Sequence, residues 1–347
     1  FRKGLRVAYS RTNRSYRNRA MVTYSTGLTS NNWAFTVSGS RRWAEEGYVQ
    51  GTFYDAWAYY LGIEKRFTNQ RIVLNVFGAP IKRGKQGPSV QEAYDLVDNN
   101  FYNPYWGYQN GKVRNSRVAN MHEPIAILTH LWNINSKLSL NTTVLGRYGR
   151  NGGTTLNWYN APDPRPDYYR YLPSYITNPE EAQYVTDHFT DPQYSQINWD
   201  NIYLINANSY DTVFNANGVD GNTVTGKRAQ YIIEENRYDQ LFANFSTNLN
   251  YQLLDNFKIK VGGYYKYYEG RNFKTLNDLL GADYWLDIDK YAERDIAIDE
   301  TSQSDINNPN RIIKEGDVFG YKYNSHVQDA RIWSQFVLDS KIAKITL

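Results

Sequence analysis

Two neighbouring segments of this chain alternate strictly between apolar and polar side chains. Residues 241–252 place Leu, Ala, Phe, Thr, Leu and Tyr at one set of alternate positions and Phe, Asn, Ser, Asn, Asn and Gln at the other. Residues 257–268 repeat the pattern after a short turn, with lysines in the second set. Because a β-strand sends successive side chains to opposite faces, each segment is predicted to be a strand with one apolar and one hydrophilic face. Such strands fit a soluble β-sandwich or an outer-membrane barrel whose hydrophilic face lines a wet lumen.

Short turns and very long polar connections divide the rest of the chain into similar segments. We expect further strands at 5–10, 20–27, 33–43, 56–67, 71–79, 124–134, 137–148, 325–338 and 341–347. The short turns fall at 28–32, 68–70, 135–136, 253–256 and near 339–340, and the long connections at about 81–123, 151–236 and 269–324. The glycine-rich run 149–153 is interpreted as a bend from strand into loop. About ten or eleven strands result.

The order of short and long connections constrains the topology. In an antiparallel up-and-down sheet, alternate connections lie at opposite ends, so the three long ones are expected at the same end. Outer-membrane barrels combine short periplasmic turns with long outside loops. Connections this long are uncommon in compact domains and are usually functional or disordered. The sequence therefore predicts an all-β chain in which 1–347 is part of a single transmembrane antiparallel up-and-down β-barrel with long extracellular loops.

Composition narrows the choice of function. The chain has no cysteine, which excludes disulfides and thiolate chemistry, and its net charge of +4 is too small to predict a nucleic-acid partner. Tyr and Trp, at 32 and 9 positions, suit membrane interfaces and ligand contacts. No apolar run is long enough for a membrane-spanning helix. The chain starts at Phe1 without an export segment and ends inside an expected strand, so we interpret it as an internal piece of a larger protein.

Several motifs carry a family resemblance. They are SGSRRWAEEGY at 38–48, GTFYDA at 51–56, FGAP at 77–80, NFYNPYWGY at 100–108, HEP at 122–124 and DPRPDYY at 163–169. Together they resemble the barrel of a TonB-dependent outer-membrane receptor of Bacteroidetes. The resemblance is to the SusC-like receptors that carry a carboxypeptidase-regulatory-like domain. It covers roughly residues 1–175, and beyond them it rests on the strand pattern.

The resemblance implies a plugged barrel of roughly 22 strands in the outer membrane of a Gram-negative bacterium, of which this chain would form about half. The plug domain and the TonB box are absent from this chain. Such a receptor binds a nutrient at its outside loops, and the TonB–ExbB–ExbD system, acting through the plug, drives its release into the periplasm. The implied partners are outer-membrane lipid, a glycan, peptide or siderophore ligand, and a surface lipoprotein of the SusD kind or another.

Aromatic side chains in the long connections are the candidate ligand contacts, because flat rings stack on sugars and pack on peptide side chains. The alternative is that they pack the connections onto one another, which large aromatics commonly do. The candidates from the first two long connections are Tyr102, Tyr105, Trp106, Tyr108, Trp158, Tyr159, Tyr168 and Tyr169.

No arrangement of residues predicts catalysis or a cofactor. The four histidines lack metal-ligand spacing, and neither a nucleophile elbow nor a phosphate loop is present. Loop calcium is a hypothesis for the aspartates of the second connection, although they do not follow an EF-hand pattern. These aspartates are Asp187, Asp191, Asp200, Asp211 and Asp220. We therefore expect a receptor that binds and gates and is not an enzyme. The alternatives are a passive porin-like channel and a secreted β-sandwich binding module.

Overall fold

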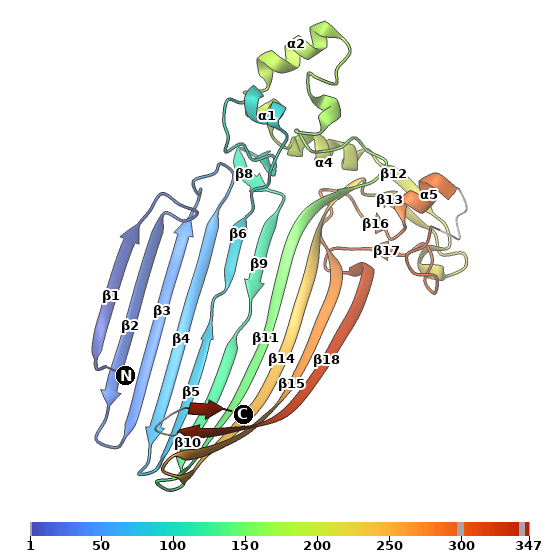
Figure 1. Cartoon of the computed structure of the whole chain (residues 1–347). Coiled ribbons are helices and arrows are strands. Elements are labelled where there is room, and N and C mark those ends of the chain that lie inside the picture. Colours follow the sequence, from blue (N-terminus) through green and yellow to red (C-terminus); the bar gives the residue numbers. More distant parts are fainter. Residues whose placement is uncertain (1, 297–301, 340–343, 347) are drawn as a thin grey trace.

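The dominant element of the computed structural model, which describes residues 2–296, 302–339 and 344–346, is a 13-stranded sheet (Figure 1). Neighbouring strands of the sheet pair antiparallel, in the order β1-β2-β3-β4-β5-β10-β11-β14-β15-β18-β19. The bounds of the N-terminal strands are β1 Gly4–Arg11, β2 Asn18–Leu28, β3 Trp33–Ala44, β4 Tyr54–Arg66 and β5 Gln70–Gly78. The later strands are β10 Ile125–Asn133, β11 Leu138–Trp158, β14 Tyr231–Leu254, β15 Phe257–Asp278, β18 Val318–Asp339 and β19 Lys344–Thr346.

Two short strands continue β5 and β10 toward the loop end of the sheet. They are β6, Ile81–Gly84, which pairs with β4, and β9, Val118–His122, which pairs with β11 and with β6. Proline interrupts both ladders, at Pro80 between β5 and β6 and at Pro124 between β9 and β10. Because proline has no backbone N–H to donate, the ladder breaks there. The Pro80 carbonyl still accepts a hydrogen bond from the Trp57 backbone N–H at 2.9 Å.

The register of the sheet separates its side chains into an apolar and a polar face. One cross-strand row runs from β3 to β18 through Phe35, Ile63, Leu74, Leu128, Val144, Phe245, Tyr265 and Ala330. The row one residue away, on the opposite face, runs through Glu64, Val73, Thr129, Thr143, Ser246, Tyr264 and Arg331. Hydrogen bonds join polar side chains on that face, such as Tyr60 to Asn75 at 2.7 Å and Tyr264 to Asp329 at 2.9 Å. The predicted alternation therefore extends across the sheet.

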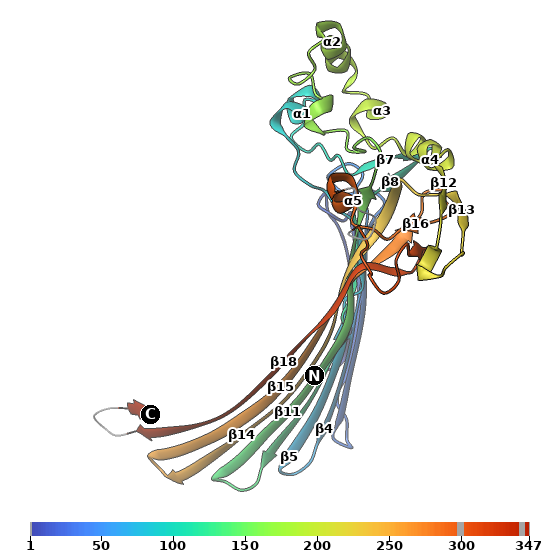
Figure 2. The same ribbon diagram turned by 90° about the vertical axis from the view of Figure 1, so that its right-hand side faces the viewer.

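The sheet is strongly curved, and its C-terminal strands bend away at the turn end (Figure 2). The turns between strands at that end are 29–32, 67–69, 134–137 and 255–256. The last turn expected there, near 339–340, lies partly outside the described residues. The long connections all leave the opposite end (Figure 1). Strands continue further into them than the sequence pattern indicated, so the connections span 85–117, 159–230 and 279–317.

The expected bend at 149–153 is wrong, because these residues lie within β11 and pair with β9 and β14. The glycines there serve packing between strands. A Cβ at Gly152 would collide with the Glu235 carboxylate, and Glu235 is bound by Arg150 at 2.8 Å. Residues 149–153 lack the apolar/polar alternation because close packing against neighbouring side chains, and not a turn, requires glycine there.

Secondary structure inside the connections is short. The first connection contains α1 (Gln91–Leu96), β7 (Trp106–Gln109) and β8 (Lys112–Asn115). The second contains α2 (Pro179–His188), α3 (Pro192–Ser195), α4 (Trp199–Ala207), β12 (Tyr210–Val213) and β13 (Val224–Lys227), with 3₁₀ turns at Tyr169–Tyr171 and Ala216–Gly218. The third contains β16 (Trp285–Leu286), α5 (Lys290–Ile296) and β17 (Ile312–Ile313). None of the helices among the described residues is long and apolar enough to cross a membrane.

Candidate functional site

The three long connections pack into one body, here called the loop assembly (85–117, 159–230, 279–296 and 302–317). Hydrophobic clusters join them in pairs. Tyr102 of the first connection is buried with Leu172 and Phe189 of the second. Val213 of the second is buried with Tyr284 and Leu286 of the third. The loop assembly is thus a folded structure with its own cores, seated on the ends of β11, β14 and β15.

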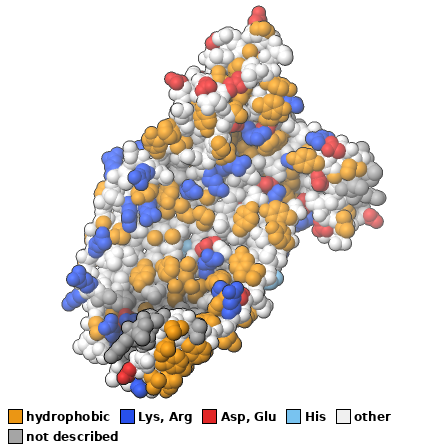
Figure 3. All heavy atoms as spheres, in the orientation of Figure 1, with side chains coloured by type: hydrophobic (Ala, Val, Ile, Leu, Met, Phe, Trp, Pro, Cys, Tyr) orange, Lys and Arg blue, Asp and Glu red, His pale blue; other side chains and the backbone are white. Residues whose placement is uncertain are grey.

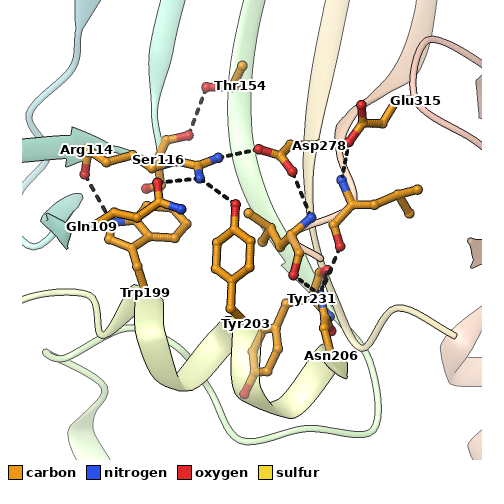
Figure 4. A network of polar contacts seen from close by, with 12 residues as sticks. Gln109, Arg114, Ser116, Thr154, Trp199, Tyr203, Asn206, Tyr231, Asp278 and Glu315 are labelled. Atoms are coloured by element: carbon orange, nitrogen blue, oxygen red, sulfur yellow. Dashed lines mark hydrogen bonds and ion pairs between the residues drawn. The ribbon is translucent and has the colours of Figure 1, made fainter. Parts of the chain in front are cut away.

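Arg114 on β8 is the centre of a polar network that links the first and second connections to the end of β15 (Figure 4). Its guanidinium donates to Asp278 at 2.6 Å, to the Tyr203 hydroxyl at 3.1 Å and to the Gln109 side chain at 2.8 Å. It also lies 4.5 Å from the centre of the Trp199 ring, while the Trp199 Nε1 donates to the Arg114 carbonyl at 3.2 Å. Arg114, Tyr203 and Asp278 point toward one another in Figure 4. This network fixes α4 against β8 and the end of β15.

Asn206, fully buried on α4, fastens the same helix to the sheet (Figure 4). Its Nδ2 donates to the carbonyls of Tyr231, Leu279 and Leu280 at 2.8, 3.0 and 3.1 Å. Its Oδ1 accepts from the backbone N–H groups of Gln230 and Tyr231 at 2.9 and 3.0 Å. Both the nitrogen and the oxygen of this buried amide are hydrogen-bonded, and they fix the backbones of the second and third connections relative to each other.

The candidate aromatics of the first connection divide into buried and exposed residues. Tyr102 and Trp106 lie in the interior of the loop assembly, as the packing alternative expects. The Tyr102 hydroxyl donates to the Ser195 carbonyl at 2.6 Å, and burial raises the pKa of Tyr102 well above its usual value. Tyr105 is partly buried below the Arg117 guanidinium, 4.6 Å from its ring centre. Tyr108 is 48% exposed and meets Trp106 edge to face at 5.3 Å.

At the end of β11, Trp158 and Tyr159 are half-buried. The Lys290 ammonium of α5 donates to the Trp158 carbonyl at 2.9 Å. Burial, together with a hydrogen bond to Glu293, raises the pKa of Tyr159 to about 12. Through Trp158 and Tyr159, the end of β11 and the start of the second connection contact α5 of the third connection.

The remaining candidates, Tyr168 and Tyr169, belong to a group at the surface of the second connection. This group, here called the aromatic cluster, consists of Tyr168, Tyr169, Tyr171 and Tyr175 with Arg165 and Arg170. The ring centres of Tyr168 and Tyr169 lie 4.8 Å apart, those of Tyr168 and Tyr171 5.3 Å, and those of Tyr169 and Tyr175 5.1 Å. Arg165 lies over Tyr168 at 5.5 Å, and Arg170 over Tyr169 at 5.7 Å.

The aromatic cluster has the composition of a recognition surface. Tyr169, Tyr171 and Tyr175 are 47%, 39% and 51% exposed, although their rings contact one another. Rigid tyrosines with adjacent guanidinium groups offer ring faces, hydroxyls and hydrogen-bond donors at a small entropic cost. The two arginines were not among the sequence candidates. The signal that could have found them is their position inside the run of aromatic residues from 165 to 175.

A pocket beside the N-terminal strands was also missed. It encloses about 660 Å³, and its lining includes Arg14, Arg83 and Lys85 together with Tyr48, Tyr54 and Phe101. The sequence offered one indication, the basic composition at the start of the first long connection. Figure 3 shows Lys and Arg side chains gathered over the N-terminal strands and just below the loops.

The aspartates considered for calcium do not come together. Asp191 caps α3 by accepting from the Gln193 N–H at 2.9 Å, and Asp211 pairs with Arg228 at 3.0 Å. Among the residues that the structure describes, no group of three or more acidic or histidine side chains is placed to hold a metal ion. The geometry therefore gives the calcium hypothesis no support.

Solved structures of import receptors have a similar fold. The ferric-catecholate import receptor Fiu of E. coli K12, in its closed form, matches 97% of this chain with a TM-score of 0.53 and 11% identity. The ferric preacinetobactin receptor BauA of Acinetobacter baumannii matches 92% with a TM-score of 0.46 and 9% identity. The RagAB peptide transporter matches 93% with a TM-score of 0.45 and 12% identity. No protein-family model matches the sequence, and no curated protein matches it.

The match to Fiu shows the class of fold. The chain is a large antiparallel sheet that matches part of a TonB-dependent receptor barrel, as the sequence predicted. It spans 39% of the length of Fiu, 36% of BauA and 30% of the RagAB chain. These neighbours are receptors and a transporter by name.

Proposed function

We propose that this chain supplies part of the wall and part of the ligand vestibule of a TonB-dependent receptor. The receptor imports a nutrient across the outer membrane of a Gram-negative bacterium. The observation that carries the proposal is the two-faced sheet, with one apolar row from Phe35 to Ala330 and a mainly polar row from Glu64 to Arg331 behind it. In a barrel, the first row faces lipid and the second faces the lumen.

The loop assembly forms the external end of the receptor, and the short turns face the periplasm. Tyr108, Tyr168 and Tyr169 contact the ligand directly, because their rings are accessible at the surface of the loop assembly. The other candidate aromatics pack inside the loop assembly and stabilise that surface, or lie at its edge. They are Tyr102, Tyr105, Trp106, Trp158 and Tyr159. A surface of tyrosine and arginine fits a glycan, a peptide or a siderophore.

The partners follow from the same proposal. Transport draws its energy from the TonB–ExbB–ExbD system, which acts through a plug domain in the barrel. A SusC-like receptor would also dock a surface lipoprotein over its loops. Both partners belong to the whole receptor, of which this chain is one part.

Thiol labelling of intact cells tests the orientation. This chain has no cysteine of its own, so two single replacements suffice: Ile306→Cys in the third connection and Ser136→Cys in a short turn. Ile306 is 80% exposed. A bulky PEG-maleimide added to whole cells should modify the cysteine at 306 and spare the one at 136 until the outer membrane is permeabilised. Equal labelling of both sites in intact cells would refute the proposed orientation.

Uptake measurements test the energy source. Cells are supplied in turn with labelled mixtures of glycans, peptides and ferric siderophores. At least one mixture should accumulate in cells that have both the receptor and TonB. Deletion of either gene should abolish the accumulation. Accumulation that depends on the receptor but persists without TonB would indicate a passive channel instead.

A further inference from the structure

We propose that the pocket beside the N-terminal strands, here called the basic pocket, binds a soluble anionic ligand group attached to a flat or apolar moiety. The basic pocket is lined in part by Arg14, Arg83, Lys85, Tyr48, Tyr54 and Phe101. Its lining shares no residue with the aromatic cluster. The inference deepens the proposed function and rests on it for the claim that the polar face of the sheet is the inner face of the barrel.

The strand register places Arg83 on the polar face. Arg83 of β6 stands opposite Tyr54 of β4, and Tyr54 shares its face with Tyr60, which bonds to Asn75. Lys85 follows Arg83 by two residues, and its backbone N–H donates to the Arg117 carbonyl at 2.7 Å. Lys82, the neighbour between Ile81 and Arg83, stands opposite Asp55 and points to the other face. The strand thus directs Arg83 toward the polar face and Lys82 away from it.

The positive charge in this region is not neutralised. The lining of the basic pocket contains no Asp or Glu. Neither Arg14, Arg83, Lys85 nor the neighbouring Arg117 forms an ion pair with any residue that the structure describes. By contrast, Arg41 on the apolar face is paired with Asp55 at 2.9 Å.

A concentration of unpaired cations repels itself and favours a bound anion. The repulsion is visible at Lys85, where burial and the charges of Arg117 and Arg83 lower the pKa of the ammonium. A carboxylate, phosphate or sulfonate would relieve this repulsion and accept charge-assisted hydrogen bonds from the arginines.

Aromatic rings form the other part of the basic pocket. Tyr48 and Phe101 meet edge to face at 4.8 Å, although they come from different connections. Tyr54 has its ring centre 5.7 Å from that of Tyr16. The volume, about 660 Å³, is within the range of small-molecule sites. A flat anionic solute therefore fits the chemistry better than a cation or a neutral polyol.

The probe for this test is methoxypyrene trisulfonate, a flat dye whose sulfonates stay ionised. It is titrated into the full-length protein in neutral detergent, and binding is followed by fluorescence anisotropy. Arg83→Glu and Lys85→Glu should each weaken binding about tenfold or more, because each removes a charge-assisted contact. Lys82→Glu makes the same change of net charge one residue away on the opposite face, and should alter the affinity by less than about twofold.

Saturable binding that Arg83→Glu and Lys85→Glu weaken, and Lys82→Glu does not, supports the proposal. An equal effect of all three variants, or no binding to the wild type, overturns it. If Arg83→Glu is not recovered folded, Arg83→Gln removes the cation without placing a carboxylate among the others and gives the same comparison.

The test is separable from that of the proposed function. Failure of the dye to bind a protein whose position 306 is labelled from outside rejects the basic pocket and leaves the receptor orientation standing. The dye could also bind specifically to a protein in which intact cells label position 136 and not position 306. That result would keep the basic pocket as an anion site but reject its place in an external vestibule.

Discussion

The carboxylate of Asp278 at the end of β15 lies 2.6 Å from the guanidinium of Arg114 on β8, 164 residues earlier in the chain. The side chains are only 24% and 29% exposed for Arg114 and Asp278. The same guanidinium reaches Tyr203 of the second long connection. Arg114 therefore joins the first connection, the second connection and the end of strand β15.

Removal of the Arg114 charge should loosen the loop assembly without unfolding the sheet. Arg114→Met keeps the aliphatic stem but loses three side-chain hydrogen bonds and leaves Asp278 unpaired. We expect a local loss of about 2 kcal/mol, since hydrogen bonds to charged groups contribute roughly 1.5–3 kcal/mol. Hydrogen exchange of the backbone amides should quicken in α4 and β8 and stay unchanged in the turn-end half of β15.

Arg294→Met is the matched control, because its ion pair with Asp295 is exposed to solvent. It should leave exchange unchanged. In a double-mutant cycle, Asp278→Asn should add little to Arg114→Met if the two residues act as a pair. If the free-energy losses of the two variants were fully additive, or if Arg114→Met left hydrogen exchange in α4 unchanged, this network would not stabilise the loop assembly.

Gly51 should be intolerant of any side chain. Its φ is +74°, and a Cβ there would collide with the ring of the buried Trp106. Gly111 has a similar φ of +72° but has open space around it. Gly51→Ala should therefore cost more than Gly111→Ala, whose cost is about 1–2 kcal/mol of backbone strain alone.

Thermal unfolding followed by tryptophan fluorescence measures this difference. Gly51→Ala should lower the midpoint clearly more than Gly111→Ala and should change the emission of the native state, since Trp106 must move. Equal midpoints for the two variants would mean that the 45–53 connection does not pack on Trp106.

Tyr169 should contribute to ligand capture but not to folding. Tyr169→Ala removes an exposed ring from the aromatic cluster, and truncation of an important aromatic contact commonly costs about 1 kcal/mol or more. We expect about fivefold weaker binding of whichever nutrient shows TonB-dependent uptake, with unchanged thermal stability. Tyr210→Ala, at a tyrosine that is 69% exposed on β12, is the control and should bind normally. Identical binding by both variants would remove the aromatic cluster from the ligand site.

Anion binding in the basic pocket should weaken at alkaline pH. The pKa of Lys85 is lowered from its usual 10.5, first by burial and then by Arg117 and Arg83. The ammonium therefore loses its proton, and its attraction for an anion, below that value. Affinity for methoxypyrene trisulfonate should fall as the pH rises from neutrality through the lowered pKa toward 10.5.

The effect of alkaline pH on folding stability has the opposite sign to its effect on anion affinity. Between the lowered folded pKa and 10.5 the unfolded chain holds more protons, so the contribution of Lys85 makes the folded state more stable as the pH rises. Lys85→Met is the control for binding, and should give a weaker affinity that varies less with alkaline pH. An equally steep loss in Lys85→Met would assign the titration to another group.

The strands of the sheet could be predicted because each carries its own signal. Residues such as Val144 and Phe245 alternate with polar neighbours, and this period depends only on local backbone geometry. The upper part of β11 carried no such signal. Gly152 leaves room for the Glu235 side chain of the neighbouring strand, and Gly149 leaves room for Glu123; a single segment does not contain that information.

The loop assembly was less accessible to sequence reasoning, because its contacts join distant residues. Nothing near Arg114 indicates Asp278 as its partner, and nothing near Tyr102 indicates Ser195. Aromatic content identified the connections that form the candidate site but did not separate buried Trp106 from exposed Tyr108. That division depends on which ring meets a neighbouring connection.

In the proposed receptor, the apolar face of this sheet meets lipid. Val144 and Phe245 stand opposite each other on that face, and Thr143 and Ser246 stand opposite each other on the reverse face. A single cysteine at each position, coupled to a fluorophore in the reconstituted full-length protein, reports its surroundings through quenching by nitroxide lipids. We predict strong lipid quenching at positions 144 and 245, and weak lipid quenching but access to aqueous iodide at 143 and 246. Equal access to iodide at all four positions would show that the apolar face of the sheet does not meet lipid.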